Sequence, residues 1–350
     1  MQKKNNIIPK LQFNISKNKR EKWIQRIFIF RKNLIMSAPF LCGKRCIIMK
    51  FGSFTFQPQK PQGFDFHVLR LKLETGIRLT PVPDMISNIA VFADNVAVRN
   101  HPDWISQSPL GPAKMGNANF NIYWDVVCAT QPEHRAEQLN YIAEVDRQSP
   151  GICLNSQYFA DHDHCTCPRC KELWRKSGLG WLEWRRKEVT DYIGQIRDVV
   201  KKELILSIQP DSVTAYEPYG GDFDDLAKYA DAFNVVMFSK NYATPWYFEM
   251  LARNFKKLLK KPFYISLYVY GPGDTPKDVP TPAEVLTTSV RCARAGADGF
   301  LYLADGSSQM LDFQKAVVED AQLRERLKSY GGKPGQEVLD RVASWEKIVK

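Results

Sequence analysis

The 350-residue sequence lacks any run of about 18 uncharged apolar residues, so a membrane-spanning helix is not expected. No G-x-G-x-x-G motif follows the first β-rich segment, which argues against an open dinucleotide-binding sheet, and no G-x-S-x-G nucleophile motif occurs. The head of the chain also lacks the small-residue cleavage site of a secretory signal. We therefore expect a cytoplasmic protein without a disulfide framework.

Most of the chain carries no net charge. Of 49 Lys and Arg and 38 Asp and Glu residues, twelve basic residues and one acid lie in residues 1–48, which leaves 37 of each sign in residues 49–350. We expect residues 1–48 to form a basic, poorly ordered or helical extension. The alternative is a transit peptide or a nucleic-acid-binding arm. For the balanced remainder, a nucleic-acid partner is not expected.

What the sequence does contain is a regular alternation of β-rich and helical segments. We predict strands at 50–56, 86–92, 120–127, 151–155, 204–209, 233–238, 262–270 and 299–304. Helical periodicity indicates helices at 132–147, 181–202 and 310–328, after 244 and 281, and at 337–350. Eight strands in about 300 residues predict a (β/α)8 TIM barrel over residues 49–330, with a C-terminal helix at 331–350 packing on it. An open doubly wound sheet is the alternative.

Polar and aromatic side chains follow the predicted strands, where a barrel of this class carries its chemistry. Paired carboxylates can serve as general acid and as nucleophile or base in glycoside hydrolysis, so the candidate catalytic residues are Asp211 with Asp305 or Asp125. Amides and aromatic rings bind sugar hydroxyls and faces, which makes Asn155, Gln157, Gln209, Asn241, Tyr242, Trp246 and Tyr268 candidate substrate-binding residues. The alternative is that the Asp and Asn residues only cap the following helices.

The densest motif is His162-Asp163-His164-Cys165-Thr166-Cys167-Pro168-Arg169-Cys170. Cys165, Cys167, Cys170 and His164 can supply a four-coordinate zinc shell, with His162 as the alternative fourth ligand. A structural zinc, a catalytic metal and free thiols or a disulfide all remain open. Cys128, Cys153 and Cys292 lie in apolar or helical patterns and are expected to pack as small hydrophobic residues.

Residues 151–184 resemble a group of TIM-barrel glycoside hydrolases known mostly as predicted proteins. The resemblance rests on the strand segment 151–159 (GICLNSQYF), the loop 165–170 (CTCPRC) and the Trp- and Arg-rich start of the next helix, 181–185 (WLEWR). It extends more faintly over residues 120–305 and implies a barrel that acts on carbohydrate. Where the group has an Asp at the end of its fourth strand, this chain has Asn155, which implies a binding role for that position.

Three hypotheses follow from these observations. The first is a glycoside hydrolase-like barrel acting on a carbohydrate through carboxylates at its rim. The second is a non-catalytic carbohydrate-binding or scaffold barrel, which Asn155 favours. The third is a metal-dependent hydrolase built on the His/Cys loop.

Overall fold

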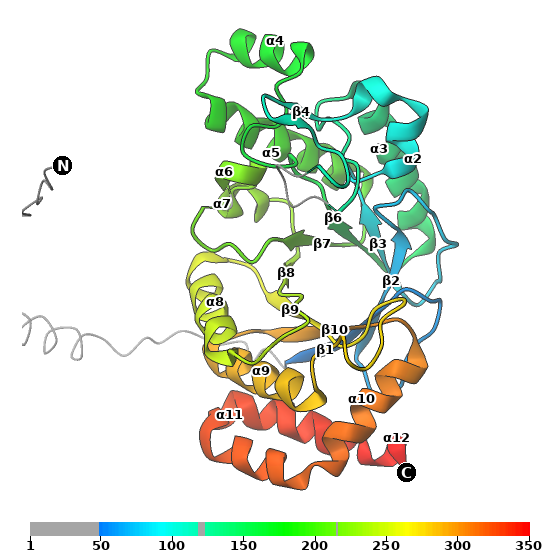
Figure 1. Cartoon of the computed structure of the whole chain (residues 1–350), viewed down its shortest axis with the longest axis vertical. Coiled ribbons are helices and arrows are strands. Elements are labelled where there is room, and N and C mark those ends of the chain that lie inside the picture. Colours follow the sequence, from blue (N-terminus) through cyan, green and yellow to red (C-terminus); the bar gives the residue numbers. More distant parts are fainter. Residues whose placement is uncertain (1–48, 118–122, 215) are drawn as a thin grey trace, which may run out of the picture. The chain divides into compact units, whose positions relative to one another are not determined.

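Eight parallel strands close into a barrel in the computed structural model, which describes residues 49–117, 123–214 and 216–350 (Figure 1). Around the barrel the strands follow the order β1 (Lys50–Thr55), β10 (Gly299–Ala304), β9 (Phe263–Tyr268), β8 (Ala232–Val236), β7 (Glu203–Ile208), β6 (Gly151–Asn155), β3 (Ile86–Ala90) and β2 (Phe66–Lys72). β2 pairs with β1 and closes the ring. The predicted barrel class is confirmed. The basic extension predicted at 1–48 lies outside the described residues.

The strand sequences are runs of apolar residues because both faces of each strand are buried. Inward-pointing side chains fill the barrel interior, and they are Phe54, Val68, Ile86, Cys153, Ile205, Ala232, Tyr264, Leu301 and Leu303. The outward-pointing side chains pack against the surrounding helices in a second, larger apolar cluster. Because all eight strands are parallel, their carboxyl ends meet at one rim.

Helices cover the outside of the barrel. They are α2 (Asn95–Asn100), the 3-10 turn η1 (Pro102–Trp104), α3 (Pro132–Gln148), α4 (Pro168–Ser177), α5 (Trp181–Val199), α6 (Tyr216–Tyr219), α7 (Phe223–Leu226), α8 (Pro245–Leu258), α9 (Pro282–Ala295), α10 (Ser307–Glu319), α11 (Ala321–Ser344) and α12 (Glu346–Val349). A capping box begins α9, because Glu284 and Thr281 each accept a hydrogen bond from the other's amide. A small hairpin of β4 (Gln107–Ser108) and β5 (Gly111–Pro112) follows η1.

The second barrel strand differs from the prediction. No strand was predicted between residues 57 and 85, whereas β2 occupies Phe66–Lys72. Charged side chains interrupt its apolar pattern, but both charges are compensated. Lys72 pairs with Asp94 at 2.8 Å and donates to the Ala90 carbonyl at 2.7 Å, and Arg70 pairs with Glu74.

The strand predicted at 120–127 is wrong as a barrel strand. Residues 120–122 lie outside the described residues, and the rest of the segment makes only isolated antiparallel bridges, from Val126 to Ala93 and from Val127 to Ile105. Its apolar side chains serve a different purpose, because they form one wall of a cavity at the barrel mouth.

The C-terminal segment packs on the barrel exterior. α11 lies against α9 and bends at Gly332, whose φ of 61° is left-handed backbone that favours glycine (Figure 1). Directly after α11, the buried Trp345 indole donates to the Gly63 carbonyl at 2.9 Å, and Arg341 in the last turn of α11 pairs with Asp65 at 2.6 Å. These contacts join the end of the chain to the β1–β2 loop.

Candidate functional site: an aromatic pocket and a cysteine centre at the barrel mouth

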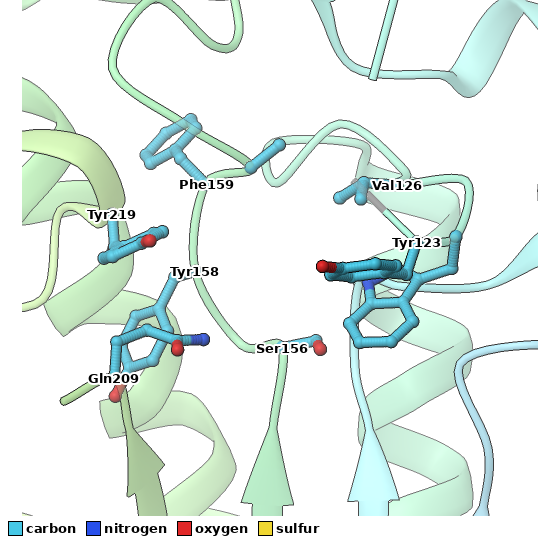
Figure 2. Close-up of a pocket in the computed structure, with 9 residues that line it drawn as sticks. Tyr123, Val126, Ser156, Tyr158, Phe159, Gln209 and Tyr219 are labelled. Carbon is cyan, nitrogen blue, oxygen red and sulfur yellow. The ribbon is translucent and has the colours of Figure 1, made fainter. Parts of the chain in front are cut away.

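A cavity of about 300 Å³ opens where β6 and β7 end (Figure 2). Its lining is dominated by aromatic rings and carries one exposed amide; the residues are Tyr123, Trp124, Val126, Ser156, Tyr158, Phe159, Ala160, Gln209 and Tyr219. Figure 2 shows Tyr158, Tyr219 and Gln209 on one side, Tyr123 and Val126 on the other, and Ser156 between them. We call this cavity the aromatic pocket.

Ser156, directly after β6, has an unusual backbone conformation. Its φ of 52° lies in the left-handed region, and it is the one non-glycine residue with positive φ among the described residues. Such a conformation costs about 1–3 kcal/mol and tends to occur at functional sites. It turns the chain sharply from the strand into the pocket wall.

Two tyrosines, Tyr158 and Tyr219, line the side of the pocket on which Gln209 lies. The buried Tyr158 hydroxyl donates to the Ser207 carbonyl at 3.1 Å, and burial raises its pKa. Burial, and then the charges of Asp161 and Asp211, raise the pKa of Tyr219.

Asp211, the first candidate catalytic residue, caps its own turn. Its carboxylate accepts hydrogen bonds from the Val213 amide and from the amide and hydroxyl of Thr214, at 2.7–2.9 Å. Burial alone would raise the pKa of Asp211, but these hydrogen bonds outweigh it and hold the pKa below its usual range. Asp211 is therefore ionised at neutral pH, and its carboxylate is engaged by its own turn.

None of the three candidate acids, Asp211, Asp125 and Asp305, lines the aromatic pocket. Asp125 accepts from the Met115 amide at 2.8 Å and lines a separate cavity between α2 and the β4–β5 hairpin, although its neighbours Trp124 and Val126 line the pocket. Asp305, after β10, accepts from the Gln57 side chain at 3.2 Å. Because β10 and β6 lie on opposite sides of the barrel order, Asp305 stands across the mouth from the pocket.

The candidate substrate-binding residues fall into two groups. Gln209 lines the pocket, and Asn155 and Gln157 flank its residue Ser156; Gln157 is fully buried and donates to the Ser207 carbonyl at 2.8 Å. The second group surrounds the start of α8 and the end of β9. There Tyr242 is buried and bonded to backbone, Asn241 caps its own turn, and Tyr268 donates to Asp274, which also binds Lys240 at 2.5 Å. Trp246 stands 60% exposed on α8.

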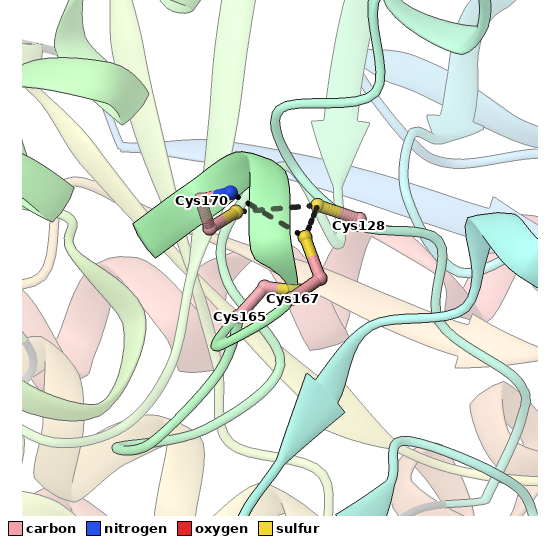
Figure 3. A group of neighbouring side chains, drawn as sticks. All are labelled: Cys128, Cys165, Cys167 and Cys170. Carbon is pink, nitrogen blue, oxygen red and sulfur yellow. Dashed lines mark hydrogen bonds between the residues drawn. The ribbon is translucent and has the colours of Figure 1, made fainter. Parts of the chain in front are cut away.

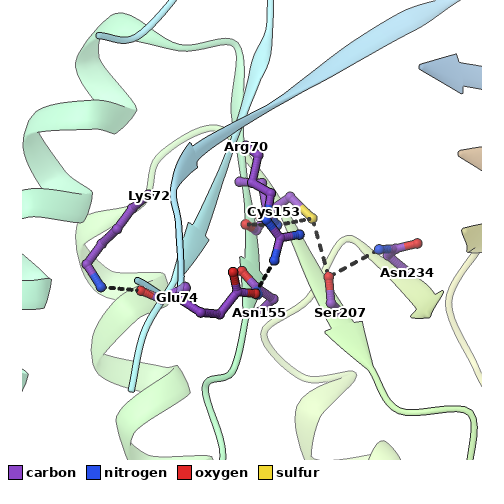
Figure 4. A network of polar contacts seen from close by, with 9 residues as sticks. Arg70, Lys72, Glu74, Cys153, Asn155, Ser207 and Asn234 are labelled. Carbon is purple, nitrogen blue, oxygen red and sulfur yellow. Dashed lines mark hydrogen bonds and ion pairs between the residues drawn. The ribbon is translucent and has the colours of Figure 1, made fainter. Parts of the chain in front are cut away.

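A buried polar cluster, which the sequence did not predict, lies inside the barrel mouth (Figure 4). The Asn155 amide donates at 2.6 Å to Glu74, which also pairs with Arg70, and the Arg70 guanidinium lies over the ring of Phe56. Polar contacts continue across the interior from Cys153 through Ser207 to Asn234. Arg70 and Glu74 were not predicted as site residues because strand β2 was not predicted. A prediction of β2 would have placed Glu74 just after a strand end.

Four cysteines from two distant segments of the chain form one cluster (Figure 3). The Sγ atoms of Cys128, Cys165, Cys167 and Cys170 all lie within 4.8 Å of one another, with Cys128 at 3.4 Å from Cys170 and 3.9 Å from Cys167. A tetrahedral zinc with Zn–S bonds of about 2.3 Å requires S–S separations of about 3.8 Å, so the donor set fits this metal. We call this group the cysteine centre.

The cysteine centre corrects one predicted ligand. Cys128, which we expected to pack as a small hydrophobic residue, supplies the fourth sulfur, and the buried His164 is not in the group. The sequence separation of Cys128 from the C-x-C-x-x-C loop concealed the contact. Hydrogen bonding, first from Cys128, lowers the pKa of Cys165 to about 7, which favours the thiolate that metals bind.

The described helices include none long and apolar enough to cross a membrane. Neither a protein family model nor a curated protein matches the sequence.

Solved structures of glycoside hydrolases share the barrel. An α-L-fucosidase isoenzyme 2 from Paenibacillus thiaminolyticus superposes with a TM-score of 0.56 at 11% identity, over 86% of this chain and 50% of that chain. A catalytic mutant of a β-galactosidase of glycoside hydrolase family 42 from G. stearothermophilus gives 0.51 at 11% identity, over 87% and 57%. This chain thus spans about half the length of these proteins. The similarity is distant and shows a fold that resembles that of TIM-barrel glycoside hydrolases.

Proposed function

We propose that this chain binds carbohydrate in the aromatic pocket. The carrying observation is a concave site of about 300 Å³ at the carboxyl ends of β6 and β7, lined by aromatic rings and by the exposed amide of Gln209. Ligand sites in barrels of this class lie at this rim, and aromatic faces with a few polar groups suit a sugar, which has apolar ring faces and polar edges. The resemblance of the fold to glycoside hydrolases supports the same substrate class.

The test is a glycan array probed with the full chain, including galactose- and fucose-terminated oligosaccharides. We expect binding that Tyr219→Ala and Gln209→Ala each weaken by about tenfold, the loss of one good contact. Tyr247→Ala is the matched control, because this half-exposed tyrosine on α8 does not line the pocket. Absence of binding to every glycan, or equal loss in the control, would contradict the proposal.

Hydrolysis of a glycosidic bond is the second candidate function. It is favoured by Asp211, whose lowered pKa keeps it ionised beside Tyr219, while Asp305 or Asp125 would have to supply the proton. Because none of the three acids lines the pocket, binding is the function that the geometry supports better. Release of reducing ends by the unmodified chain, lost in Asp211→Asn with binding retained, would establish hydrolysis.

We further propose that the cysteine centre holds a structural zinc ion. Cys128, Cys165, Cys167 and Cys170 would occupy all four positions, which leaves no open site for a substrate and disfavours the metal-dependent hydrolase. When bound, the ion would cross-link the chain between residues 128 and 170. Elemental analysis should find one zinc per chain, and Cys128→Ser should reduce this content to near zero.

A further inference from the structure

Three chain segments enclose the aromatic pocket, and none of them is a barrel strand. The first wall is residues 123–128, the second is 156–167, and the third comprises 209–214 and 216–219. Such connecting segments need fixed points to hold a binding geometry, because loops carry few backbone ladder hydrogen bonds of their own. The structure supplies two fixed points outside the pocket.

The cysteine centre joins the first wall to the second. Cys128 ends the first wall, two residues after the pocket residue Val126, and its Sγ lies 3.4 Å from that of Cys170. Cys165 and Cys167 end the second wall, and the Gln107 amide donates to Cys165 Sγ at 3.2 Å. A metal bound by these four sulfurs would fix the separation of the two walls.

Arg185, on α5, joins the second wall to the third. Its fully buried guanidinium donates to the carbonyls of Asp161 at 2.6 Å and Pro218 at 2.5 Å, and also to that of Glu217. The same group lies 4.8 Å from the ring centroid of Phe159, a pocket residue. Three carbonyls from two walls thus converge on one cation.

The charges of the two fixed points are complementary. Four thiolates around a divalent ion leave a net charge of about −2, which a buried site must balance. Burial lowers the pKa of Arg185 to about 10, while Asp161, Asp163, Cys170 and Cys165 counteract that shift, so the guanidinium remains charged at neutral pH next to the cysteines.

We propose that the cysteine centre and Arg185 act as one clamp that sets the shape of the aromatic pocket, so that metal loading controls carbohydrate affinity. The affinity part rests on the proposed carbohydrate binding, whereas the structural part does not. In this clamp Arg185 is a positioning residue, because it contacts the walls and not the cavity. Without metal the first wall is no longer held against the second. Each binding event must then order the two walls, and this cost weakens the affinity.

The first test is hydrogen exchange of the full chain, loaded with Zn²⁺ or stripped by a chelator. We expect stripping to reduce amide protection in all three walls, including 216–219, which contains no cysteine, while β9 and β10 keep theirs. Loss of protection confined to residues 165–170 would overturn the clamp, as would a full chain that binds no Zn²⁺.

Two variants separate the fixed points. Cys128→Ser should lose Zn²⁺ and loosen the first and second walls, whereas the control Cys292→Ala removes an equally buried thiol outside the centre and should change neither. Arg185→Lys keeps the charge but cannot reach three carbonyls, so it should retain Zn²⁺ and loosen the third wall. A third wall as protected in Arg185→Lys as in the unmodified chain would overturn the role of Arg185. If the stripped chain unfolds, hydrogen exchange of the zinc-loaded Arg185→Lys variant still tests whether Arg185 holds the third wall.

The second test measures affinity for galactose- and fucose-terminated oligosaccharides with and without Zn²⁺. The clamp predicts about a tenfold weaker affinity on stripping, restored by added Zn²⁺. Equal affinity in both states would overturn the coupling. If no glycan binds although the exchange pattern appears, the clamp stands and the proposed function fails.

Discussion

At the residue scale, Ser156 shows how much a single position shapes the pocket. Its left-handed φ of 52° redirects the chain at the end of β6, and its neighbours Asn155 and Gln157 point into hydrogen bonds with Glu74 and with the Ser207 carbonyl. The sequence does not predict this conformation, because serine rarely adopts a positive φ.

We predict that Ser156→Val lowers the free energy of unfolding by about 2 kcal/mol, because a β-branched side chain is strained at positive φ. Ser156→Gly should change it by less than about 1 kcal/mol, since glycine adopts this conformation freely but also loosens the unfolded chain. Urea unfolding of both variants measures the difference. Equal stabilities would show that the turn is not strained.

Asp211 provides a second prediction at this scale, which concerns pH. The hydrogen bonds from Val213 and Thr214 lower its pKa from the usual 3.8 in the folded state, so it stabilises the fold above that value and the contribution disappears as the pH falls through the lowered pKa. The unmodified chain should therefore exceed Asp211→Asn in stability at pH 6, and this advantage should shrink as the pH falls below about 4. Denaturant midpoints across this range test the sign. A gap that widens on acidification would be incompatible with an ionised cap.

At the scale of elements, the strands that could be predicted were those whose apolar runs are unbroken, such as β6, β7 and β10. β2 escaped prediction because Arg70 and Lys72 interrupt its pattern, and their compensating partners Glu74 and Asp94 are recognisable only in three dimensions. The segment 120–127 produced the opposite error, because its aromatic and β-branched residues suit a pocket wall as well as a strand.

The same difference between local and long-range information governs the candidate site. The C-x-C-x-x-C loop predicted three of the four clustered cysteines, since they lie within six residues of one another. Cys128 and Arg185 act through contacts with distant segments, to Cys170 and to the carbonyls of Glu217 and Pro218, and nothing in their local sequence distinguishes them.

The ion pair between β2 and the start of α2 can be tested directly. Lys72→Met leaves the buried Asp94 without its partner and should lower the free energy of unfolding by about 3–5 kcal/mol. The double variant Lys72→Met, Asp94→Asn removes the unpaired charge and should recover a large part of this loss, because Asn can still cap α2 at the Ala97 amide. Chemical denaturation of the single and double variants compares them. A double variant less stable than the single one would refute the explanation.

At the scale of the whole molecule, the barrel and the pocket walls share one apolar cluster but differ in their remaining contacts. Continuous parallel pairing around eight strands and the apolar clusters on both faces stabilise the barrel, and the larger cluster also includes wall residues such as Val126, Tyr158 and Phe159. The walls depend in addition on contacts outside the sheet, at the cysteine centre and Arg185. This arrangement allows the rim to change its ligand chemistry while the barrel is kept, as expected for a fold that hosts many functions.

The position of a bound sugar tests the central proposal most directly. A crystal structure of the zinc-loaded full chain with the tightest-binding oligosaccharide of the galactose- and fucose-terminated set would provide it. We predict a sugar ring in the aromatic pocket, between Tyr219 and Tyr123, with a hydroxyl bonded to Gln209. A glycan bound elsewhere on the barrel, for example on Trp246 of α8 with the pocket empty, would contradict the account.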